Sequence, residues 1–358
     1  MADLEKAREI ISAVDKEMVT LFEKRMKAAE LVASYKKEHG LQIFDGAREA
    51  ALLERNAGLV ENDNYRSYYV SFLQHTIDLS KAYQRRLMEG MRVAYSGVKG
   101  AFAEIAAGKI FPDAAAVPYT DFAAAYEAVE KDECDVAILP IENSYNGDVG
   151  QVMDLAHFGS LHINGIYDLE VTQNLLALPG TELSDIQEVI SHPQALGQCA
   201  EFIRRHGWKE TQAVNTAVAA RAVAKSGRKD LAAIGSAEAG ELYGLETLEG
   251  HIEESSGNTT RFAVFSRSAK APAPGDNRFV MTFTVGNRAG ALGEAVSVIG
   301  KQGFNLASLK SRPTKNANWD YYFFVEGEGN IHSEPGKEMV DKLTRCCNSV
   351  KVLGSFEE

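Results

Sequence analysis

Two cations in the first helical stretch of the chain stand where they could contact an anion in the interior of a bundle. Arg25 occupies a position at which the apolar repeat of its helix requires a hydrophobic residue. Lys36 follows 11 residues later, about three turns along nearly the same helix face. A buried guanidinium group is costly unless it is ion-paired or faces an anion. The pair therefore indicates either a site for an anionic molecule or ordinary solvated charges on an open face.

Polar residues on the next two expected helices extend this set. Arg48 and Glu49 fall in the first turn of a second helix, and Ser80 and Gln84 share one face of a third because they are four residues apart. The sum is a bundle interior with several cations, one carboxylate and one amide. Spacing alone leaves open whether these groups form a site or a solvated surface.

The repeat of apolar and small residues that would position these groups predicts helices throughout residues 1–90. Asp45 is the expected N-cap of a second helix that ends near Leu59. Residues 62–64 are expected to form a loop, and a third helix is expected over residues 65–88, ended by Gly90. Steps of three and four, with one gap of seven, predict a first helix of about nine turns, with an apolar face made of Leu4, Ala7, Ile11, Val14, Met18, Leu21, Ala28, Val32 and Tyr35. Because a segment this short cannot easily bury so long a helix, we expect an antiparallel partner or an intertwined dimer.

These residues carry a resemblance. The stretches KAREIISAVD, EKRMKAAELVASYKKEHG and FDGAREAALLERN resemble the all-helical chorismate mutases of the intertwined-dimer type. The resemblance implies a unimolecular rearrangement of chorismate to prephenate, which needs no nucleophile, metal or cofactor. Catalysis would come from holding the reactive conformer and from charges placed where the transition state polarises. The positions that match the family's site are Arg8, Arg25, Lys36, Asp45, Arg48, Glu49, Ser80 and Gln84.

The resemblance also assigns roles. It implies that Arg25 and Arg8 clamp the two substrate carboxylates, with Arg8 donated by the partner subunit, and that Arg48 completes a cationic wall. Asp45 and Ser80 would belong to the same substrate-binding site. Arg8 precedes Arg25 by 17 residues and lies about 100° away around the same helix, which agrees with donation from a partner.

The catalytic groups implied by the resemblance are Lys36, Gln84 and Glu49. Lys36 and Gln84 would hydrogen-bond the ether oxygen as its bond to carbon breaks. Glu49 would accept a hydrogen bond from the substrate hydroxyl.

Residues 91–267 have a different residue pattern, which predicts an α/β domain of two lobes. Short β-rich runs such as MRVAYS, CDVAILP, LAAIG and TRFAVF alternate with alanine-rich helical stretches. Polar residues that include Glu142, Asn143 and Ser191 follow apolar runs, and open α/β sheets place ligands just past their strands. Turn and cap chemistry explains Asn, Ser and Thr at such places equally well.

The motifs of several catalytic classes are missing from the sequence. No GxGxxG follows a strand, and the chain has no GxxxxGK[ST], GxSxG or HExxH. Instead, AYSGVKGAFAEIAA, LPIENSYNGDV, SHPQALGQC, NTAVAARAVA, ELYGL and NTTRFAVFSR resemble prephenate dehydratases along the whole domain. The complete chain then resembles the bifunctional chorismate mutase–prephenate dehydratase family of L-phenylalanine biosynthesis. The second reaction removes water and carbon dioxide from prephenate and gives phenylpyruvate.

For the dehydratase site, the resemblance implies that Thr260 is catalytic and gives a hydrogen bond or a proton to the departing hydroxyl. Arg261 is the natural carboxylate anchor because its guanidinium is planar, or it braces the site from behind. The other residues implied to line the pocket are Glu142, Asn143, Ser191, Gln198 and Thr259.

The C-terminal segment, residues 278–358, follows a linker over residues 268–277 and predicts a ferredoxin-like α+β domain of βαββαβ order. Its first strand is expected to be half-buried, with Phe279, Met281, Phe283 and Val285 on one face. NRAGAL, FNLASLKSRP and WDYYFFVEGEG resemble the ACT regulatory domain of these dehydratases, which implies phenylalanine binding between two such domains and feedback inhibition. An ACT domain that only dimerises is the alternative. The implied effector-binding residues are Gly290, Ala291, Leu292, Asn305, Leu306, Ser311 and Arg312.

The sequence departs from the family pattern at five positions. Tyr145, Asn146 and Asp148 occupy a loop in which the family commonly has small residues. Lys310 replaces the usual glutamate before Ser-Arg-Pro, which reverses a charge. Gly293 stands where the family often has a bulky residue.

Length and composition set limits on the class of protein. The 358 residues predict two or three domains, placed at 1–90, 91–267 and 278–358. A net charge of −12 disfavours nucleic-acid binding. No apolar run of membrane-spanning length and no secretory signal are found, so we expect a cytoplasmic protein without a membrane partner. No spacing implies a cofactor or a metal, and reduced thiols are expected for Cys134, Cys199, Cys346 and Cys347.

A different class of function also fits part of this pattern. Two lobes resemble a solute-binding architecture and an ACT domain senses ligands, so the chain could be a small-molecule sensor whose catalysis has decayed. Alternatively, only one of the two activities is retained. The joint presence of Thr260, Arg261, Glu142 and Asn143 argues against decay.

Overall fold

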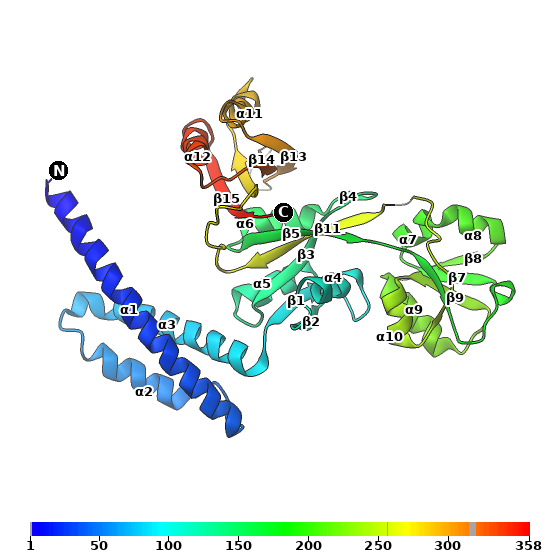
Figure 1. Ribbon diagram of the computed structural model, residues 1–358, viewed down its shortest axis with the longest axis horizontal. Coiled ribbons are helices and arrows are strands. Elements are labelled where there is room, and N and C mark those ends of the chain that lie inside the picture. Colours follow the sequence, from blue (N-terminus) through cyan, green and yellow to red (C-terminus); the bar gives the residue numbers. More distant parts are fainter. Residues whose placement is uncertain (1, 256, 315–319) are drawn as a thin grey trace. The chain divides into compact units, whose positions relative to one another are not determined.

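The structure is a computed structural model that describes residues 2–255, 257–314 and 320–358 (Figure 1). The chain forms two compact units, Met1–Met91 and Arg92–Glu358. None of the described helices is both long enough and apolar enough to cross a membrane. Trp319, which opens the predicted WDYYFFVEGEG motif, lies outside the described residues.

The first unit consists of helices α1 (Ala2–Glu38), α2 (Gly46–Ala57) and α3 (Asp63–Glu89). The predicted N-cap of α2 is confirmed, because the Asp45 side chain accepts a hydrogen bond from the backbone N–H of Arg48. The predicted loop over 62–64 is wrong in part. Asn62 itself caps α3, so the two residues after it already belong to the first turn of the helix.

This unit buries little of its own apolar surface. The buried residues of its helices are Ala29, Ala33, Ile77, Ser80 and Gln84. Many large apolar side chains of α1 remain exposed to solvent, among them Leu4, Ile10, Ile11, Val14, Met18, Val19, Leu21, Phe22, Leu31 and Tyr35. The two side chains that α1 buries, Ala29 and Ala33, are not in the predicted apolar face, and most of that face is exposed within one copy of the chain.

The second unit begins with an α/β lobe built on one mixed sheet, in the order β2-β1-β3-β11-β5, with β4 paired to β3. Strands β1, β2 and β3 are parallel, whereas β11 runs antiparallel to both of its neighbours. The elements are β1 (Arg92–Ser96), α4 (Phe102–Ile110), β2 (Ala115–Tyr119), α5 (Phe122–Glu130), β3 (Val136–Asn143), β4 (Gly147–Asp148), α6 (Gly150–Phe158), β5 (His162–Glu170) and β11 (Thr259–Ser266).

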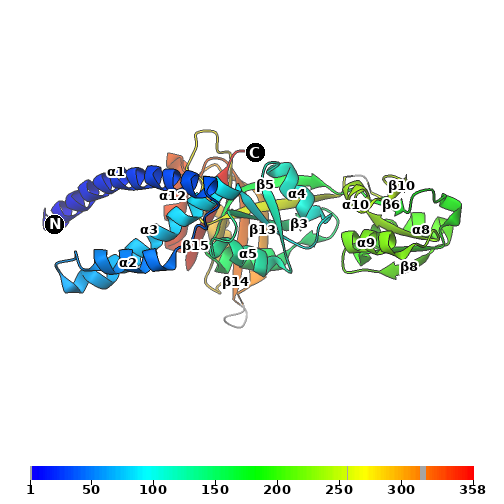
Figure 2. The ribbon, with the colours of Figure 1, turned by 90° about the horizontal axis from the view of Figure 1, so that it is seen from below.

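A second lobe is inserted between β5 and β11, so the chain crosses between the lobes twice (Figure 2). Its own sheet has the order β10-β6-β9-β7-β8. The elements are β6 (Asn174–Ala177), a 3-10 turn (Leu183–Asp185), β7 (Glu188–Ser191), α7 (Pro193–Gln198), α8 (Ala200–His206), β8 (Lys209–Gln212), α9 (Thr216–Ser226), β9 (Leu231–Gly235), α10 (Ala237–Tyr243) and β10 (Glu246–Glu249). Two lobes with mixed sheets agree with the predicted α/β domain.

The C-terminal part of the second unit follows the βαββαβ order. Its antiparallel sheet has the strand order β13-β14-β12-β15. The elements are β12 (Arg278–Thr284), α11 (Ala291–Lys301), β13 (Asn305–Pro313), β14 (Tyr321–Glu328), α12 (Glu334–Cys346) and β15 (Ser349–Phe356).

The expectation of a half-buried first strand in this sheet is wrong. Phe279, Met281 and Phe283 lie on one face, as predicted, and share a core with residues of α11 and α12. Val280 and Thr282 on the other face, however, are also inaccessible to solvent. That face packs on the first lobe, and Val280 belongs to the same core as residues of β3, β5, α5 and α6. The C-terminal sheet therefore packs directly on the first lobe.

Candidate active sites

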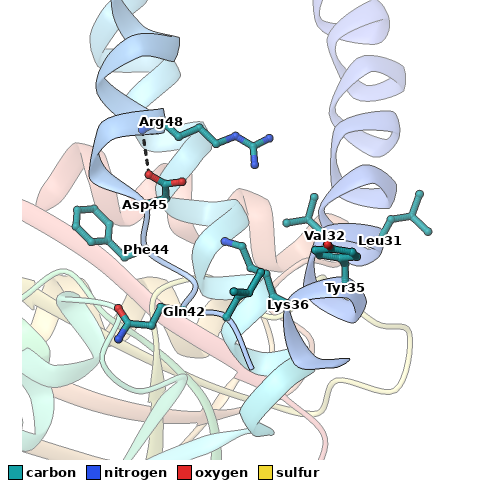
Figure 3. Close-up of a pocket in the computed structure, with 9 residues that line it drawn as sticks. Leu31, Val32, Tyr35, Lys36, Gln42, Phe44, Asp45 and Arg48 are labelled. Carbon is teal, nitrogen blue, oxygen red and sulfur yellow. Dashed lines mark hydrogen bonds between the residues drawn. The ribbon is translucent and has the colours of Figure 1, made fainter. Parts of the chain in front are cut away.

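The helical unit encloses a cavity of about 220 Å³ between its three helices. Seven of the eight residues predicted for the mutase site line it: Arg25, Lys36, Asp45, Arg48, Glu49, Ser80 and Gln84. A neighbouring hollow of about 530 Å³ shares Val32, Lys36, Asp45 and Arg48 with it (Figure 3). The helical spacing thus brings these polar groups to one place, as the sequence predicts.

Arg25 reaches from α1 to α3. Its guanidinium donates to the backbone oxygen of Thr76 at 2.9 Å and to the hydroxyl of Ser80. Burial lowers the pKa of Arg25 from its ordinary value. Both of these acceptors are uncharged, so the positive charge at this end of the cavity is left for a ligand.

Lys36 and Arg48 project from α1 and α2 toward the same space (Figure 3). The Nζ atom of Lys36 donates to the backbone oxygen of Ile43 at 2.6 Å. Burial and then the nearby Arg48 lower the pKa of Lys36, while Asp45 and Glu49 oppose that shift. Asp45 acts here as the helix cap that fixes the first turn of α2, and with it the backbone of Arg48.

Gln84 is 8% exposed, and its Oε1 atom is buried without a hydrogen-bond partner. An unsatisfied buried acceptor costs on the order of 1–3 kcal/mol, so each one requires an explanation. A donor on a bound molecule, or a water, would supply the missing bond.

Lys81 is a cavity residue that sequence reasoning missed. Its Nζ atom lies 2.9 Å from Oε2 of Glu49 and 2.9 Å from Oδ1 of Asp78. Burial alone would lower the pKa of Lys81, but the hydrogen bonds to Asp78 and Glu49 outweigh it and raise the pKa. In the sequence, Lys81 directly follows Ser80 and stands four residues after Ile77, which places it beside the predicted site. The structure shows that Ile77 is buried.

The eighth predicted residue, Arg8, is exposed on α1. It stands 17 residues before Arg25, which is about 25 Å along the helix axis at 1.5 Å per residue. The structure therefore does not bring Arg8 into the cavity of its own subunit.

A chain of side-chain amides joins the two lobes of the second unit. The Nδ2 atom of Asn143 donates to Oγ1 of Thr260 at 2.9 Å and to Oδ1 of Asn258 at 2.8 Å. The amides of Asn258 and Gln173 both donate to Oε1 of Gln198 at 3.1 Å. Through Asn258, the predicted residues Asn143, Thr260 and Gln198 are thus connected in one hydrogen-bond network.

Sequence reasoning did not select Gln173 or Asn258 as site residues. Gln173 is 2% exposed, and its Oε1 atom has no hydrogen-bond partner. In the sequence it is recognisable as part of a polar pair, Gln173 and Asn174, at the point where the chain enters the apolar strand β6. Asn258 opens the NTTRF motif and is 5% exposed.

Two of the predicted pocket residues have local partners instead. Ser191 is fully buried, and its hydroxyl donates to the backbone oxygen of Ile234 at 2.6 Å. Thr259 donates from its backbone N–H to the hydroxyl of Ser144 at 2.9 Å. In this structure both residues tie neighbouring segments together.

Glu142 and Arg261 lie on the opposite face of the sheet from Asn143 and Thr260, because successive side chains of a strand alternate. Arg261 of β11 is in register with Glu142 of β3, and the next residue, Phe262, is in register with Pro140. Ile141 therefore has no partner on β11 and forms a bulge. The face that carries Glu142 and Arg261 is the one covered by the C-terminal sheet.

Arg261 is surrounded by carboxylates on that face. Its Nη1 atom lies 2.8 Å from Glu326 of β14 and 3.5 Å from Glu142, and its Nε atom lies 3.5 Å from Asp168. Burial alone would lower the pKa of Arg261, but Glu326 outweighs it and raises the pKa. Of the two roles considered for Arg261, this geometry matches the brace behind the site and not the carboxylate anchor.

The predicted effector residues do not form one cluster within a subunit. Gly290, with φ 82°, caps α11, and Ala291 and Leu292 begin that helix. Asn305 is six residues from Ser311 along β13, or about 20 Å at 3.3 Å per residue. Leu306, next to Asn305, packs on the core beneath the helices.

Arg312 connects the C-terminal sheet to the first lobe. Its Nε and Nη2 atoms donate to the two carboxylate oxygens of Asp154 on α6, at 2.8 and 3.1 Å. The Nη1 atom lies only 1.8 Å from where a Cβ atom would stand on Gly150, so a side chain at that position would displace the guanidinium. This guanidinium is therefore engaged in packing between domains.

Comparison with known proteins decides the family. Residues 7–85 match the model of chorismate mutase type II, and residues 93–270 match the model of prephenate dehydratase. A bifunctional chorismate mutase/prephenate dehydratase of Enterobacter agglomerans is 33% identical, over 98% of this chain and 94% of that protein. The chain belongs to the bifunctional chorismate mutase/prephenate dehydratase family. It rearranges chorismate to prephenate and converts prephenate to phenylpyruvate.

Other relatives match the second unit. An arogenate dehydratase/prephenate dehydratase of Arabidopsis thaliana is 36% identical over 74% of this chain and 72% of that protein. The crystal structure of the prephenate dehydratase of Arthrobacter aurescens, a complex with L-Phe, has a TM-score of 0.69 and 28% identity, and covers 75% of this chain and 90% of that one. Among the residues that the structure of this bifunctional family member describes, no group of three His, Cys, Asp or Glu side chains is placed to hold a metal ion.

Proposed function

We propose that the two reactions occur at two separate sites, the mutase reaction in the helical cavity and the dehydratase reaction at the junction of the two lobes. The observation that supports this division is the distribution of donors. The helical cavity gathers cations, and the lobe junction gathers neutral amides and a hydroxyl. A dianion that rearranges needs charge around it, whereas a leaving hydroxyl needs a donor.

In the mutase site, Arg25 and Arg48 would bind the carboxylates of chorismate. Lys36 and Gln84 would donate to the ether oxygen. The buried Oε1 atom of Gln84 would still need a hydrogen-bond donor, on the bound molecule or on a water. Glu49, held by Lys81 at 2.9 Å, would accept from the substrate hydroxyl. Each group is placed before the reaction begins, so it stabilises charge without reorganisation.

We infer that the working form is at least a homodimer in which Arg8 completes the partner's site. Arg8 is about 25 Å from Arg25 along its own helix, so it cannot serve its own cavity. The uncovered apolar side chains of α1, such as Ile11 at 59% and Leu21 at 63% exposure, give a second copy a surface to cover. An antiparallel α1 of a second copy would bring Arg8 toward the other cavity.

In the dehydratase site, Thr260 would donate to the departing hydroxyl and Asn143 would orient Thr260. Gln198, Gln173 and Asn258 link this pair to the second lobe, so closure of the lobes would align the donor and exclude water. Arg261 and Glu142 would brace the strands from behind.

We further propose that residues 278–358 are an ACT domain that binds L-phenylalanine and inhibits the dehydratase. Support comes from the GAL and SRP motifs and from the Arthrobacter aurescens relative solved in complex with L-Phe. The predicted residues Gly290 and Asn305 would then meet across two copies, because Gly290 follows the Thr284 end of β12 whereas Asn305 is in register with its Arg278 end. The four free cysteines agree with a role in the cytoplasm.

One experiment tests these assignments together. The purified chain is incubated with chorismate alone, and prephenate and phenylpyruvate are followed over time with and without L-phenylalanine. We expect phenylpyruvate to form and L-phenylalanine to suppress it. Phenylpyruvate that forms equally fast with the amino acid present would contradict the regulatory assignment. Turnover of added prephenate without turnover of chorismate would contradict the assignment of the helical cavity.

A further inference from the structure

We propose that Lys310, a residue of the C-terminal sheet, is a positioning residue of the dehydratase site. The inference rests on the proposed function, in which Asn143 and Thr260 belong to that site. It is carried by a half-buried ion-pair cluster in which the Lys310 ammonium contacts two carboxylates of the β3–β4 hairpin, Glu142 and Asp148.

The hairpin determines where Asn143 points. Its Oδ1 atom accepts hydrogen bonds from the backbone N–H groups of Tyr145 and Asn146, at 3.1 and 2.9 Å, so the turn is built around this side-chain carbonyl. The other end of the same amide donates to Thr260 and Asn258. If the hairpin opens, the amide loses the orientation that places the Thr260 hydroxyl.

The same hairpin contains an electrostatic conflict. Glu142 of β3 is directly paired with Asp148 of β4. Like charges that face each other across two strands destabilise the pairing. Without a cation between them, these carboxylates would push apart the two strands that hold the turn.

Lys310 removes this conflict. Its Nζ atom lies 2.6 Å from Oε1 of Glu142 and contacts Asp148 as well, and the side chain is only 14% exposed. Burial alone would lower the pKa of Lys310, but hydrogen bonds to Asp148 and Glu142 outweigh it and raise the pKa. The lysine is therefore held in its charged form between the two carboxylates.

A bulge in the C-terminal sheet delivers Lys310 to this place. The register of β13 against β14 shifts between Leu306 and Ser308, and a bulge of this kind changes which residues face each side. Leu306 therefore packs toward the helices, whereas Lys310 is paired with Phe324, whose side chain lies in the core shared with the first lobe.

Two of the five departures from the family pattern, Lys310 and Asp148, thus contact each other. Lys310 replaces a usual glutamate, and Asp148 lies in a loop that commonly has small residues. In this chain the reversed charge of the first is matched by the carboxylate of the second. The C-terminal domain then completes the dehydratase site as well as regulating it.

The test begins with Lys310→Met in the full-length chain, assayed with added prephenate. We expect the dehydratase kcat/KM to fall about tenfold or more, because small misplacements of catalytic groups cost factors of this size. The mutase rate of the same preparation should not change. Lys337→Met, at an exposed lysine paired with Glu334 in the same domain, is the matched control and should leave both activities unchanged.

Rescue separates positioning from general damage to the fold. Adding Asp148→Asn to Lys310→Met removes the facing charges and should restore most of the dehydratase activity, as should Lys310→Arg alone. If Lys310→Met does not fold, the double variant Lys310→Glu with Asp148→Lys exchanges the two charges. Its dehydratase activity should exceed that of Lys310→Glu alone. A Lys310→Met chain with wild-type kcat/KM, or double variants no better than their single parents, would overturn the proposal.

The variant Asn143→Ala distinguishes a failure of the role of Lys310 from a failure of the proposed dehydratase site. If Asn143→Ala retains full dehydratase activity, the site assignment fails, and the role of Lys310 fails with it. If Asn143→Ala is inactive while Lys310→Met is unimpaired, the site assignment stands and only the role of Lys310 is refuted.

Discussion

Arg25 and Lys36 of the helical cavity use their positive charge differently from Arg261 and Lys310 of the second unit. In the cavity, Arg25 and Lys36 donate to uncharged oxygens, and burial lowers the pKa of both. In the second unit, Arg261 and Lys310 each contact carboxylates, and their pKa values are raised. The first arrangement leaves charge for a ligand. The second uses its cations to hold strands in place and presents neutral donors such as Thr260.

The largest expected effect tests the first half of this contrast. Lys36→Ala should lower the mutase rate by roughly 10²–10³, the cost of losing a preorganised donor to a developing oxyanion. The dehydratase rate with added prephenate should stay near wild type. Steady-state assays with chorismate and with prephenate measure the two rates separately.

Lys37→Ala is the matched control for this prediction, because Lys37 is the next residue of α1 and is exposed. It should leave the mutase rate unchanged. Equal losses of mutase and dehydratase activity in Lys36→Ala would mean that the two sites are not separate.

The second prediction addresses the neutral donor of the lobe junction. Thr260→Ala removes the hydroxyl that accepts from Asn143 at 2.9 Å, and we expect dehydratase kcat to fall by about 10². Thr260→Ser keeps a hydroxyl in the same place and should retain most of the rate. A Thr260→Ala chain with wild-type kcat would remove Thr260 from the mechanism and weaken the contrast between the sites.

The two sites also differ in how far the sequence predicted them. On helices, spacing is nearly sufficient, because residues three, four, seven or eleven apart share a face whatever surrounds the helix. Seven predicted residues therefore meet in one cavity. Lys81 was missed because a lysine on a helix surface is usually solvated.

In the second unit, spacing was not sufficient. Glu142 and Asn143 are adjacent in sequence, yet one faces the C-terminal sheet and the other faces Thr260. The bulge at Ile141 and the burial of both faces of β12 depend on which sheet packs on which. Single-sequence patterns do not carry that information, and so the sequence left two roles open for Arg261.

The third prediction sharpens the account of the helical cavity. Arg8→Ala and Arg25→Ala chains should each lack mutase activity. If Arg8 acts in the partner's site, random mixing makes half of the dimers mixed, each with one intact site, so about a quarter of wild-type activity should return. The mutase rate after mixing by reversible unfolding measures this recovery.

Homodimers treated in the same way are the control for that experiment, since they should regain nothing. No recovery in the mixed sample would mean that Arg8 serves its own subunit or does not contact the substrate. The geometry of α1 makes the first alternative hard to satisfy.

The smallest expected effect concerns how the second unit depends on pH. His157 on α6 stacks on Tyr322 with ring centroids 4.0 Å apart, and its Nδ1 atom is 2.9 Å from the Thr282 hydroxyl. Burial and then Lys351 lower the pKa of His157, while Asp154 opposes them. The unfolded state therefore binds a proton more readily than the folded state as the pH falls below about 6.5, so acidification through that range should destabilise this unit.

Thermal unfolding of the full chain between pH 7.5 and pH 5.5 measures this dependence. His157→Gln should lose stability at pH 7.5, because the stacking on Tyr322 is lost, and should show a shallower decline toward pH 5.5. His332→Gln, at an exposed histidine of the same unit, should decline as steeply as wild type. An unchanged slope in His157→Gln would assign the acid sensitivity to another group.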